Sequence, residues 1–127
     1  MKVCIIGNSL TGLALAKALV NKEIFVDVLY NKKKKPSDLS RTLGISKSNI
    51  EFFNKNISNI SRLLWKIKKI EIFSENSNKD QIIGFEDKKD NLFCILQNHK
   101  IINQLNLELK KNRFLRFKKE ISYQNLI

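Results

Sequence analysis

The chain has 127 residues and a formal net charge of +12, with 24 Lys and Arg residues against 12 Asp and Glu residues. This length allows one domain with its own hydrophobic core, and it is short for an enzyme built on a dinucleotide-binding fold. His99 is the single histidine, which excludes a histidine cluster for a metal and a paired-histidine acid–base system. No apolar run is long enough to span a bilayer, and we expect no secretion signal.

The basic charge favours an anionic partner, which could be nucleic acid, acidic lipid or a phosphate-bearing ligand. Arginine is the side chain preferred for bidentate phosphate and base contacts, and it occurs only at positions 41, 62, 113 and 116. Lysine, asparagine and isoleucine are abundant, a bias that an AT-rich genome produces by itself. Nucleic-acid binding, or binding to a membrane surface through basic residues, is therefore the least favoured hypothesis.

The first predicted elements are a strand over residues 3–6, a glycine turn and a helix over residues 12–20. The turn has the spacing Gly7-x-Ser9-x-x-Gly12. Gly7 permits a tight turn, Gly12 lets the helix pack close to the strand, and the helix N-terminus offers N–H groups to a diphosphate. Ser9 replaces the middle glycine of the usual fingerprint, so its Cβ narrows the approach while its hydroxyl can donate to a phosphate. The predicted cofactor-binding residues of this turn are Gly7, Ser9, Leu10, Thr11 and Gly12, and the alternative is an ordinary strand-to-helix turn.

A second strand over residues 24–30 completes a βαβ unit. The strands are nearly continuous apolar runs, which is typical of parallel strands covered on both faces. An acidic residue usually follows such a strand and holds the ribose, but here the positions are Tyr30 and Asn31. Asp27 lies three residues before the tip and faces the opposite side of the sheet from Tyr30. Tyr30 and Asn31 can hydrogen-bond a ribose without the charge-assisted bond of a carboxylate, so we expect weaker nucleotide binding.

Four lysines at positions 32–35, followed by Pro36, come directly after this strand. Like charges repel one another and proline resists the continuation of a strand or helix, so the pattern predicts a solvated loop. The functional alternatives are attraction of the phosphates of a nucleotide and docking on an anionic bilayer surface.

The middle of the chain predicts short elements. A short, semi-apolar segment covers residues 40–46, and a capping box of Ser48 and Glu51 opens a helix that continues to Asn56. A second helical stretch is predicted over residues 60–65. Strands over residues 67–73 and 81–85, with a polar turn between them, predict a β-hairpin.

The last third predicts a strand over residues 92–96, a helix from Asn98 to about Lys111 and a final strand over residues 113–117. Phe114 and Phe117 among basic residues are more typical of a strand with one buried face than of a nucleic-acid patch. Cys4 and Cys94 lie in apolar runs without metal-type spacing, so we expect core thiols in a reducing cytosol.

The acidic residues do not predict catalysis. Asp38, Glu51, Glu71 and Asp80 lie in polar stretches that are typical of turns, caps and solvated faces. We therefore assign no catalytic residue and no metal ligand from the sequence.

The order of these motifs resembles the N-terminal third of the class A flavin monooxygenases, and within them the ubiquinone-biosynthesis hydroxylases. Residues 7–16 resemble the FAD fingerprint of that family, and residues 41–46 resemble its arginine-bearing segment. Residues 67–73 resemble the basic strand before its hairpin. Residues 96–100 resemble the segment that usually carries Asn-Arg there, with His99 in place of the arginine.

The resemblance implies FAD as cofactor, NAD(P)H as reductant, and hydroxylation of an aromatic ring by dioxygen, with the cofactor supplying the chemistry. Gly7, Ser9 and Gly12 would meet the pyrophosphate, Tyr30 would stand where the family has a ribose-binding acid, and Arg41 would lie near the flavin. The expected fold class is α/β: a Rossmann-like FAD/NAD(P)-binding βαβ unit with a parallel sheet plus an added β-hairpin region, incomplete relative to the family.

The expected organisation is one FAD-binding domain over residues 1–127, with residues 67–96 resembling the start of a substrate domain. The second FAD motif of the family, a Gly-Asp segment, has no counterpart in this chain, so we expect it to be inactive alone and completed by a second polypeptide. The expected location is the cytoplasm, with peripheral association at the inner membrane as a further option. The competing hypothesis is a non-catalytic Rossmann-like nucleotide-binding module.

Overall fold

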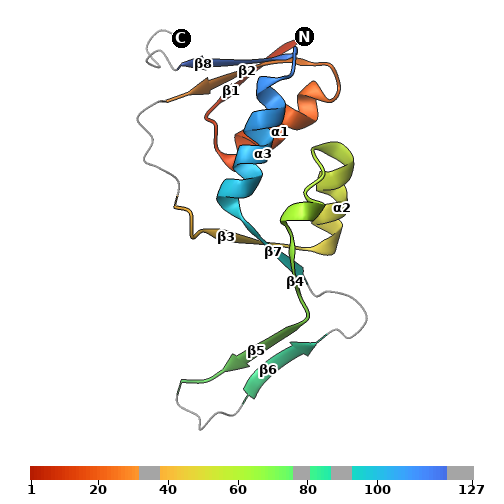
Figure 1. The fold of residues 1–127 in the computed structure, drawn as a ribbon, viewed down its shortest axis with the longest axis vertical. Helices are drawn as coiled ribbons and strands as arrows, with labels where there is room; N and C mark the ends of the chain where they lie inside the picture. The colour runs from red at the N-terminus through yellow and green to blue at the C-terminus, as the bar shows by residue number, and fades with distance from the viewer. Residues whose placement is uncertain (32–37, 76–80, 87–92, 120–127) are drawn as a thin grey trace.

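The computed structural model describes residues 1–31, 38–75, 81–86 and 93–119. The helices among them are α1 (Leu10–Val20), α2 (Lys47–Asn56) and α3 (Asn98–Lys110), with one 3₁₀ turn at Ser61–Leu63. The strands are β1 (Lys2–Ile6), β2 (Phe25–Tyr30), β3 (Thr42–Ile45), β4 (Trp65–Ile67), β5 (Lys69–Phe73), β6 (Gln81–Glu86), β7 (Phe93–Gln97) and β8 (Leu115–Lys119). They form a parallel sheet β1-β2-β8, an antiparallel sheet β3-β7-β4 and the hairpin β5-β6, which lies at the far end of the molecule from the parallel sheet (Figure 1).

The parallel sheet confirms the predicted α/β class. In the register of this sheet, Val26 of β2 lies between Val3 of β1 and Leu115 of β8. Helices α1 and α3 lie side by side against the same face of the sheet (Figure 1), where α1 connects β1 to β2 and α3 leads from β7 into β8. The core between helices and sheet contains Leu13 and Ala16 of α1, Val26 and Val28 of β2, and Ile101, Leu105 and Leu109 of α3.

The other face of the parallel sheet corrects two expectations. Side chains alternate along β1, so Ile5 is buried against the helices whereas Cys4 is exposed and Ile6 is 55% exposed. The prediction that both faces of β1 are covered is therefore wrong for the described part of the chain, as is the prediction that Cys4 is a core thiol. The second cysteine, Cys94, is buried in β7 as predicted.

The N-cap of α2 lies two residues before the predicted capping serine, Ser48. Ser46 is the N-cap of α2, and its Oγ accepts a hydrogen bond from the Asn49 N–H at 3.3 Å. Ser48 lies inside the first turn, and its Oγ is 3.1 Å from the Ser46 Oγ. The helix begins earlier because β3 ends at Ile45, which leaves Ser46 in the extended conformation that an N-cap requires.

The helical stretch predicted over residues 60–65 is only the 3₁₀ turn at Ser61–Leu63. Trp65 begins β4 and lies opposite Ile95 of β7, so pairing with β7 extends the backbone there. The strand predicted over residues 67–73 is likewise divided, since β4 ends at Ile67 and β5 begins at Lys69. The predicted hairpin is confirmed by the pairing of β5 with β6.

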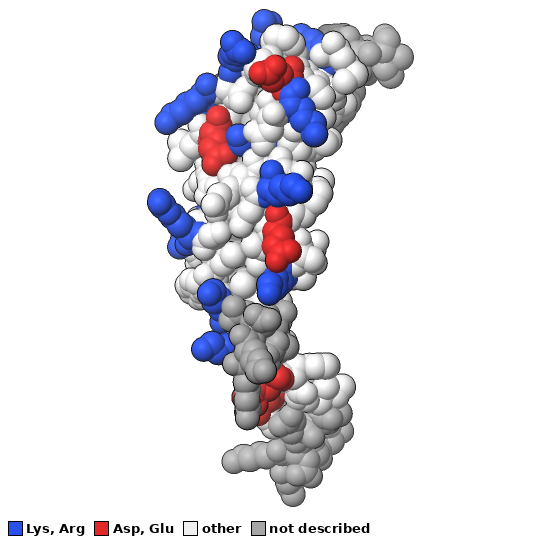
Figure 2. Space-filling model, turned by 90° about the vertical axis from the view of Figure 1, so that its right-hand side faces the viewer, with Lys and Arg blue, Asp and Glu red and all other residues white. Residues whose placement is uncertain are grey.

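Charge is distributed along the molecule. On the face in Figure 2, Lys and Arg side chains lie in separate places, with Asp and Glu side chains between several of them. The lysine run at positions 32–35 falls outside the described residues. Within the described ranges, no helix is both long enough and apolar enough to cross a membrane.

Candidate nucleotide-binding site

The turn after β1 has the backbone conformation that its first glycine predicts. Gly7 has a φ angle of 104°, a region that residues with a side chain rarely adopt. Its N–H donates a hydrogen bond to the Leu29 carbonyl at 2.8 Å, which fixes the turn against the end of β2. The turn therefore lies at the carboxyl ends of the two strands, where ligands of open α/β sheets bind.

Gly12 is required for a different reason. A Cβ at this position would lie 2.6 Å from the Gly7 carbonyl oxygen, closer than real Cβ contacts allow. Ile5 lies beneath the same point, with its Cγ2 3.4 Å from that Cβ position. The absence of a side chain at Gly12 thus lets α1 start directly against the turn.

The N-terminus of α1 is open to solvent. Ser9 is the N-cap, and its carbonyl accepts the Leu13 N–H at 2.9 Å. Within the described chain, its exposed side chain makes no capping hydrogen bond. Since the first N–H groups of a helix have no intrahelical carbonyl partner, the turn presents donors and a free hydroxyl toward solvent. This arrangement suits an anion such as a diphosphate.

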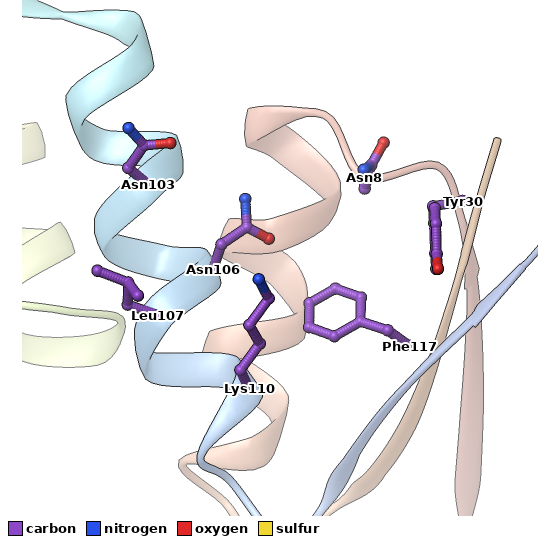
Figure 3. Close-up of a pocket in the computed structure, with 7 residues that line it drawn as sticks. All are labelled: Asn8, Tyr30, Asn103, Asn106, Leu107, Lys110 and Phe117. Carbon is purple, nitrogen blue, oxygen red and sulfur yellow. The ribbon is translucent and has the colours of Figure 1, made fainter. Parts of the chain in front are cut away.

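A cavity of about 590 Å³ lies beside the turn and beside the tip of β2. The residues that line it come from the turn, from strands β2 and β8 and from the exposed side of α3 (Figure 3): Asn8, Tyr30, Asn103, Asn106, Leu107, Lys110 and Phe117. The rings of Tyr30 and Phe117 meet edge to face, with centroids 6.4 Å apart. The lining thus combines an aromatic wall with amide groups and one amine.

The structure gathers some of the predicted site residues and separates others. Tyr30 lines the cavity, and Asn31 follows it at the exposed end of β2. The side chain of Arg41 is exposed and does not line this cavity. The Arg41 carbonyl accepts the Asn98 N–H at 3.0 Å, so its segment is joined to the start of α3. His99 follows Asn98, and its Nδ1 is buried without a hydrogen-bond partner among the described residues.

Sequence reasoning missed the contribution of α3. Asn103, Asn106 and Lys110 lie three and four residues apart, which places them on one side of the helix. The helical periodicity of the sequence places these polar residues opposite the apolar side of the same helix. It does not show that this polar side faces the tip of β2. Asn8 was missed although it lies inside the predicted turn.

Asp27 lies outside this cavity, as its position in β2 predicted. Its Oδ2 is 2.8 Å from the Lys2 Nζ and 2.9 Å from the Lys118 Nζ. Hydrogen bonds from Lys118 first and Lys2 second hold the pKa of the Asp27 carboxyl below its ordinary value. Asp27 is therefore a charged, paired and buried group on the face of the sheet opposite α1 and α3, and it does not replace the missing ribose acid. The described ranges contain no group of three or more His, Cys, Asp or Glu that could hold a metal ion.

No family model matches the sequence, and no curated protein matches it. The fold has solved relatives. The p-nitrophenol 4-monooxygenase PnpA of Pseudomonas putida matches with a TM-score of 0.73 and 14% identity, over 92% of this chain and 31% of that chain. HpxO of Klebsiella pneumoniae, solved with FAD and uric acid, matches with a TM-score of 0.66 and 15% identity, over 92% of this chain and 30% of that chain. PqsL of Pseudomonas aeruginosa, a probable FAD-dependent monooxygenase, matches with a TM-score of 0.72 and 13% identity, over 94% of this chain and 32% of that chain.

These matches establish the fold. The chain has the fold of one segment of FAD-dependent monooxygenases, and it spans about a third of the length of the structures it matches. The particular resemblance to ubiquinone-biosynthesis hydroxylases has no counterpart among these structures and stays a prediction.

Proposed function

We propose that this chain is the FAD-binding portion of a flavin-dependent aromatic-ring hydroxylase. The observation that carries the proposal is the contact between Gly12 and the Gly7 carbonyl, which brings an open helix N-terminus against the carboxyl end of β1. The cavity at Tyr30 begins beside this turn. The neighbouring structures include FAD-dependent monooxygenases, which supports FAD as the ligand.

The residues present fit the adenosine diphosphate half of FAD. The N–H groups at the start of α1 and the Ser9 hydroxyl would hold the pyrophosphate, with Leu10 and Thr11 in that first turn. Tyr30 and Asn31 would contact the ribose through neutral hydrogen bonds. By the family resemblance, Arg41 would lie near the flavin. When bound, FAD supplies the redox chemistry, and this chain supplies binding and orientation.

Hydroxylation by this chain requires more than these residues. The structures that it matches are about three times as long, so we propose that further polypeptide, in the same protein or in a second chain, completes the flavin site. The same proposal includes NAD(P)H as the reductant, ubiquinone biosynthesis as the pathway and peripheral association with a membrane.

Purification with bound flavin tests the proposal. The protein should retain yellow colour and flavin absorbance, or bind added FAD with quenching of flavin fluorescence. Ser9→Asp should weaken this binding by at least tenfold, because a carboxylate at the N-cap faces the diphosphate. Ser48→Asp is a matched control on an exposed turn of α2. Failure of the wild type to bind FAD or ADP at millimolar concentration contradicts the proposal.

A second candidate is a non-catalytic nucleotide-binding module. It is favoured because none of the described residues that line the cavity carries a carboxylate, whereas FAD sites of this topology usually carry one at the tip of the second strand. Binding of ADP without retention of FAD would favour this candidate over the first.

A further inference from the structure

The hairpin of β5 and β6 carries apolar side chains on one of its two faces. In its register, Ile70 lies opposite Phe85, and Ile72 lies opposite Ile83. Side chains alternate along a strand and directly opposite residues share a face, so these four residues lie on the same side of the hairpin. Ile72 and Ile83 are each 46% exposed, and Phe85 is 52% exposed. These four residues form the apolar face of the hairpin, and much of it is open to solvent.

The charged side chains of the hairpin lie on its other face. Lys69 is opposite Glu86, and Glu71 is opposite Gly84, in the positions that alternate with the apolar ones. The Lys69 Nζ lies 2.6 Å from the Glu71 Oε1. Another surface can therefore pack against the apolar face without removing a charge from water, which would be costly.

The hairpin has few strands for a sheet with an apolar face. Among the described residues its sheet contains β5 and β6 alone, and it lies at the far end of the molecule from the parallel sheet (Figure 1). A two-stranded hairpin is only marginally stable in water, and it gains stability when its apolar face packs against further structure. We therefore expect a partner surface for this face.

The charge of the chain differs between the hairpin segment and the rest. Residues 69–90 contain six of the 12 Asp and Glu residues but only four of the 24 Lys and Arg residues. The segment thus has a net charge of −2, whereas the remaining residues have a net charge of +14. Two copies of the chain repel each other through their basic parts, and this repulsion is smallest when they meet at their hairpins.

We propose that the apolar face of the hairpin is the contact surface between two copies of this chain, which pack face to face about a two-fold axis. The contact stacks two apolar layers and leaves the charged faces in solvent. The exposed parts of these side chains offer roughly 350 Å² per copy and about 700 Å² in the dimer, less than the ~1,000 Å² of a stable interface. We therefore expect a weak dimer, with a Kd of about 10–100 µM. The proposed nucleotide site lies at the parallel sheet, at the other end of the molecule, so the dimer leaves it accessible (Figure 1).

Sedimentation equilibrium of the full chain tests the proposal. Between about 5 and 500 µM, the mass should rise from that of one chain to that of two. Raising the salt concentration from about 0.1 to 0.5 M should strengthen the association, because salt screens the repulsion between two copies with a net charge of +12. A head-to-tail contact between the acidic hairpin of one copy and the basic part of the next would weaken with salt and would continue beyond two copies. Either of these results overturns the proposal.

Two sets of variants locate the contact. The double variant Ile72→Thr, Ile83→Thr should weaken dimerisation by about tenfold or more, and threonine keeps a high strand propensity. Its matched control is Glu71→Thr, on the same strand but on the charged face, which should dimerise like the wild type. Phe85→Asp should abolish the dimer, because a carboxylate would be buried in the contact. Its control is Phe52→Asp, at a position of α2 that is 61% exposed, which should have no effect.

The outcomes decide between a second copy and other partners. A chain that stays monomeric at the highest concentration overturns the proposal, and binding of an apolar dye to that monomer would leave the face to a different polypeptide. A dimer that persists in both hairpin variants, or that is lost equally in the two controls, also overturns it. FAD binding is measured on the same samples at concentrations where the wild type is monomeric. Its loss would contradict the proposed function and leave this inference unchanged.

Discussion

The carbonyl oxygen of Gly7 occupies the space in which a side chain on Gly12 would begin, 2.6 Å from the ideal Cβ position. The two residues therefore act as a pair: Gly7 turns the chain with a φ angle of 104°, and Gly12 accepts the close approach that this turn creates. The turn brings the start of α1 to the carboxyl end of β1, and the proposed nucleotide binding depends on that position.

Gly12→Ala should destabilise the fold by about 1–3 kcal/mol, because the new methyl group meets backbone rather than a mobile side chain. Urea denaturation followed by circular dichroism measures the effect. Gly44→Ala is the control, since the Cβ there would lie 3.3 Å from the ring of Phe93, which can shift. Equal losses in the two variants would contradict the close approach.

Gly7→Ala tests the turn itself, without a steric clash. No atom lies within 4 Å of the ideal Cβ of Gly7, so the cost comes from the φ angle alone. We expect about 1–2 kcal/mol from this backbone conformation. Gly7→Asn should cost less than Gly7→Ala if positive φ is the cause, because asparagine tolerates positive φ better. A loss that is the same for both residues would point to another origin.

The βαβ unit was predictable from the sequence because local patterns encode it. Continuous apolar strands, two glycines at fixed spacing and a helix of small residues each constrain the backbone directly. The exposure of Cys4 was not predictable in this way, because an apolar strand shows that its faces are apolar but not which of them another element covers. The N-cap is Ser46 although only Ser48 has a glutamate three residues later, because the end of β3 leaves Ser46 in the extended conformation of an N-cap.

The cavity was the least predictable feature. Tyr30 and Lys110 are far apart in the sequence, and they line one cavity only because α3 lies beside α1 on the same face of the sheet (Figure 1). Periodicity identified the apolar stripe of α3 that packs in the core. It could not show what the polar stripe of that helix would face, because this depends on the crossover between β7 and β8.

Ser58→Ala should destabilise the protein by about 1–2 kcal/mol, because Ser58 is a buried polar residue that joins the loop after α2 to α3. Its Oγ donates to the Glu108 Oε1 at 2.8 Å and accepts a hydrogen bond from the Gln104 Nε2 at 2.8 Å. Thermal and urea unfolding measure the loss. Ser48→Ala, at an exposed serine, should change stability by less than about 0.5 kcal/mol. An effect of Ser58→Ala no larger than that of the control would mean that water replaces the network without loss.

The ion pairs of Asp27 predict how stability depends on pH. Lys118 and Lys2 lower the pKa of Asp27 in the folded state below the ordinary value of 3.8, so the unfolded chain takes up the proton first. The stabilisation is therefore complete above an ordinary aspartate pKa and is lost as the pH falls through the lower pKa of the folded state. Both lysines are about half exposed, with side-chain exposures of 54% and 48%, so solvent screens the pairs.

Asp27→Asn should accordingly lose about 1 kcal/mol at neutral pH, and the difference from the wild type should shrink toward zero at about pH 2. Urea unfolding of both proteins across this range measures the difference, and high salt should reduce it at neutral pH. The control is Asp38→Asn, whose carboxylate is bound by Ser40 in an exposed loop, so a smaller change is expected. A difference between Asp27→Asn and the wild type that stays constant down to the lowest pH would show that the carboxylate stabilises the sheet by shape and hydrogen bonding rather than by its charge.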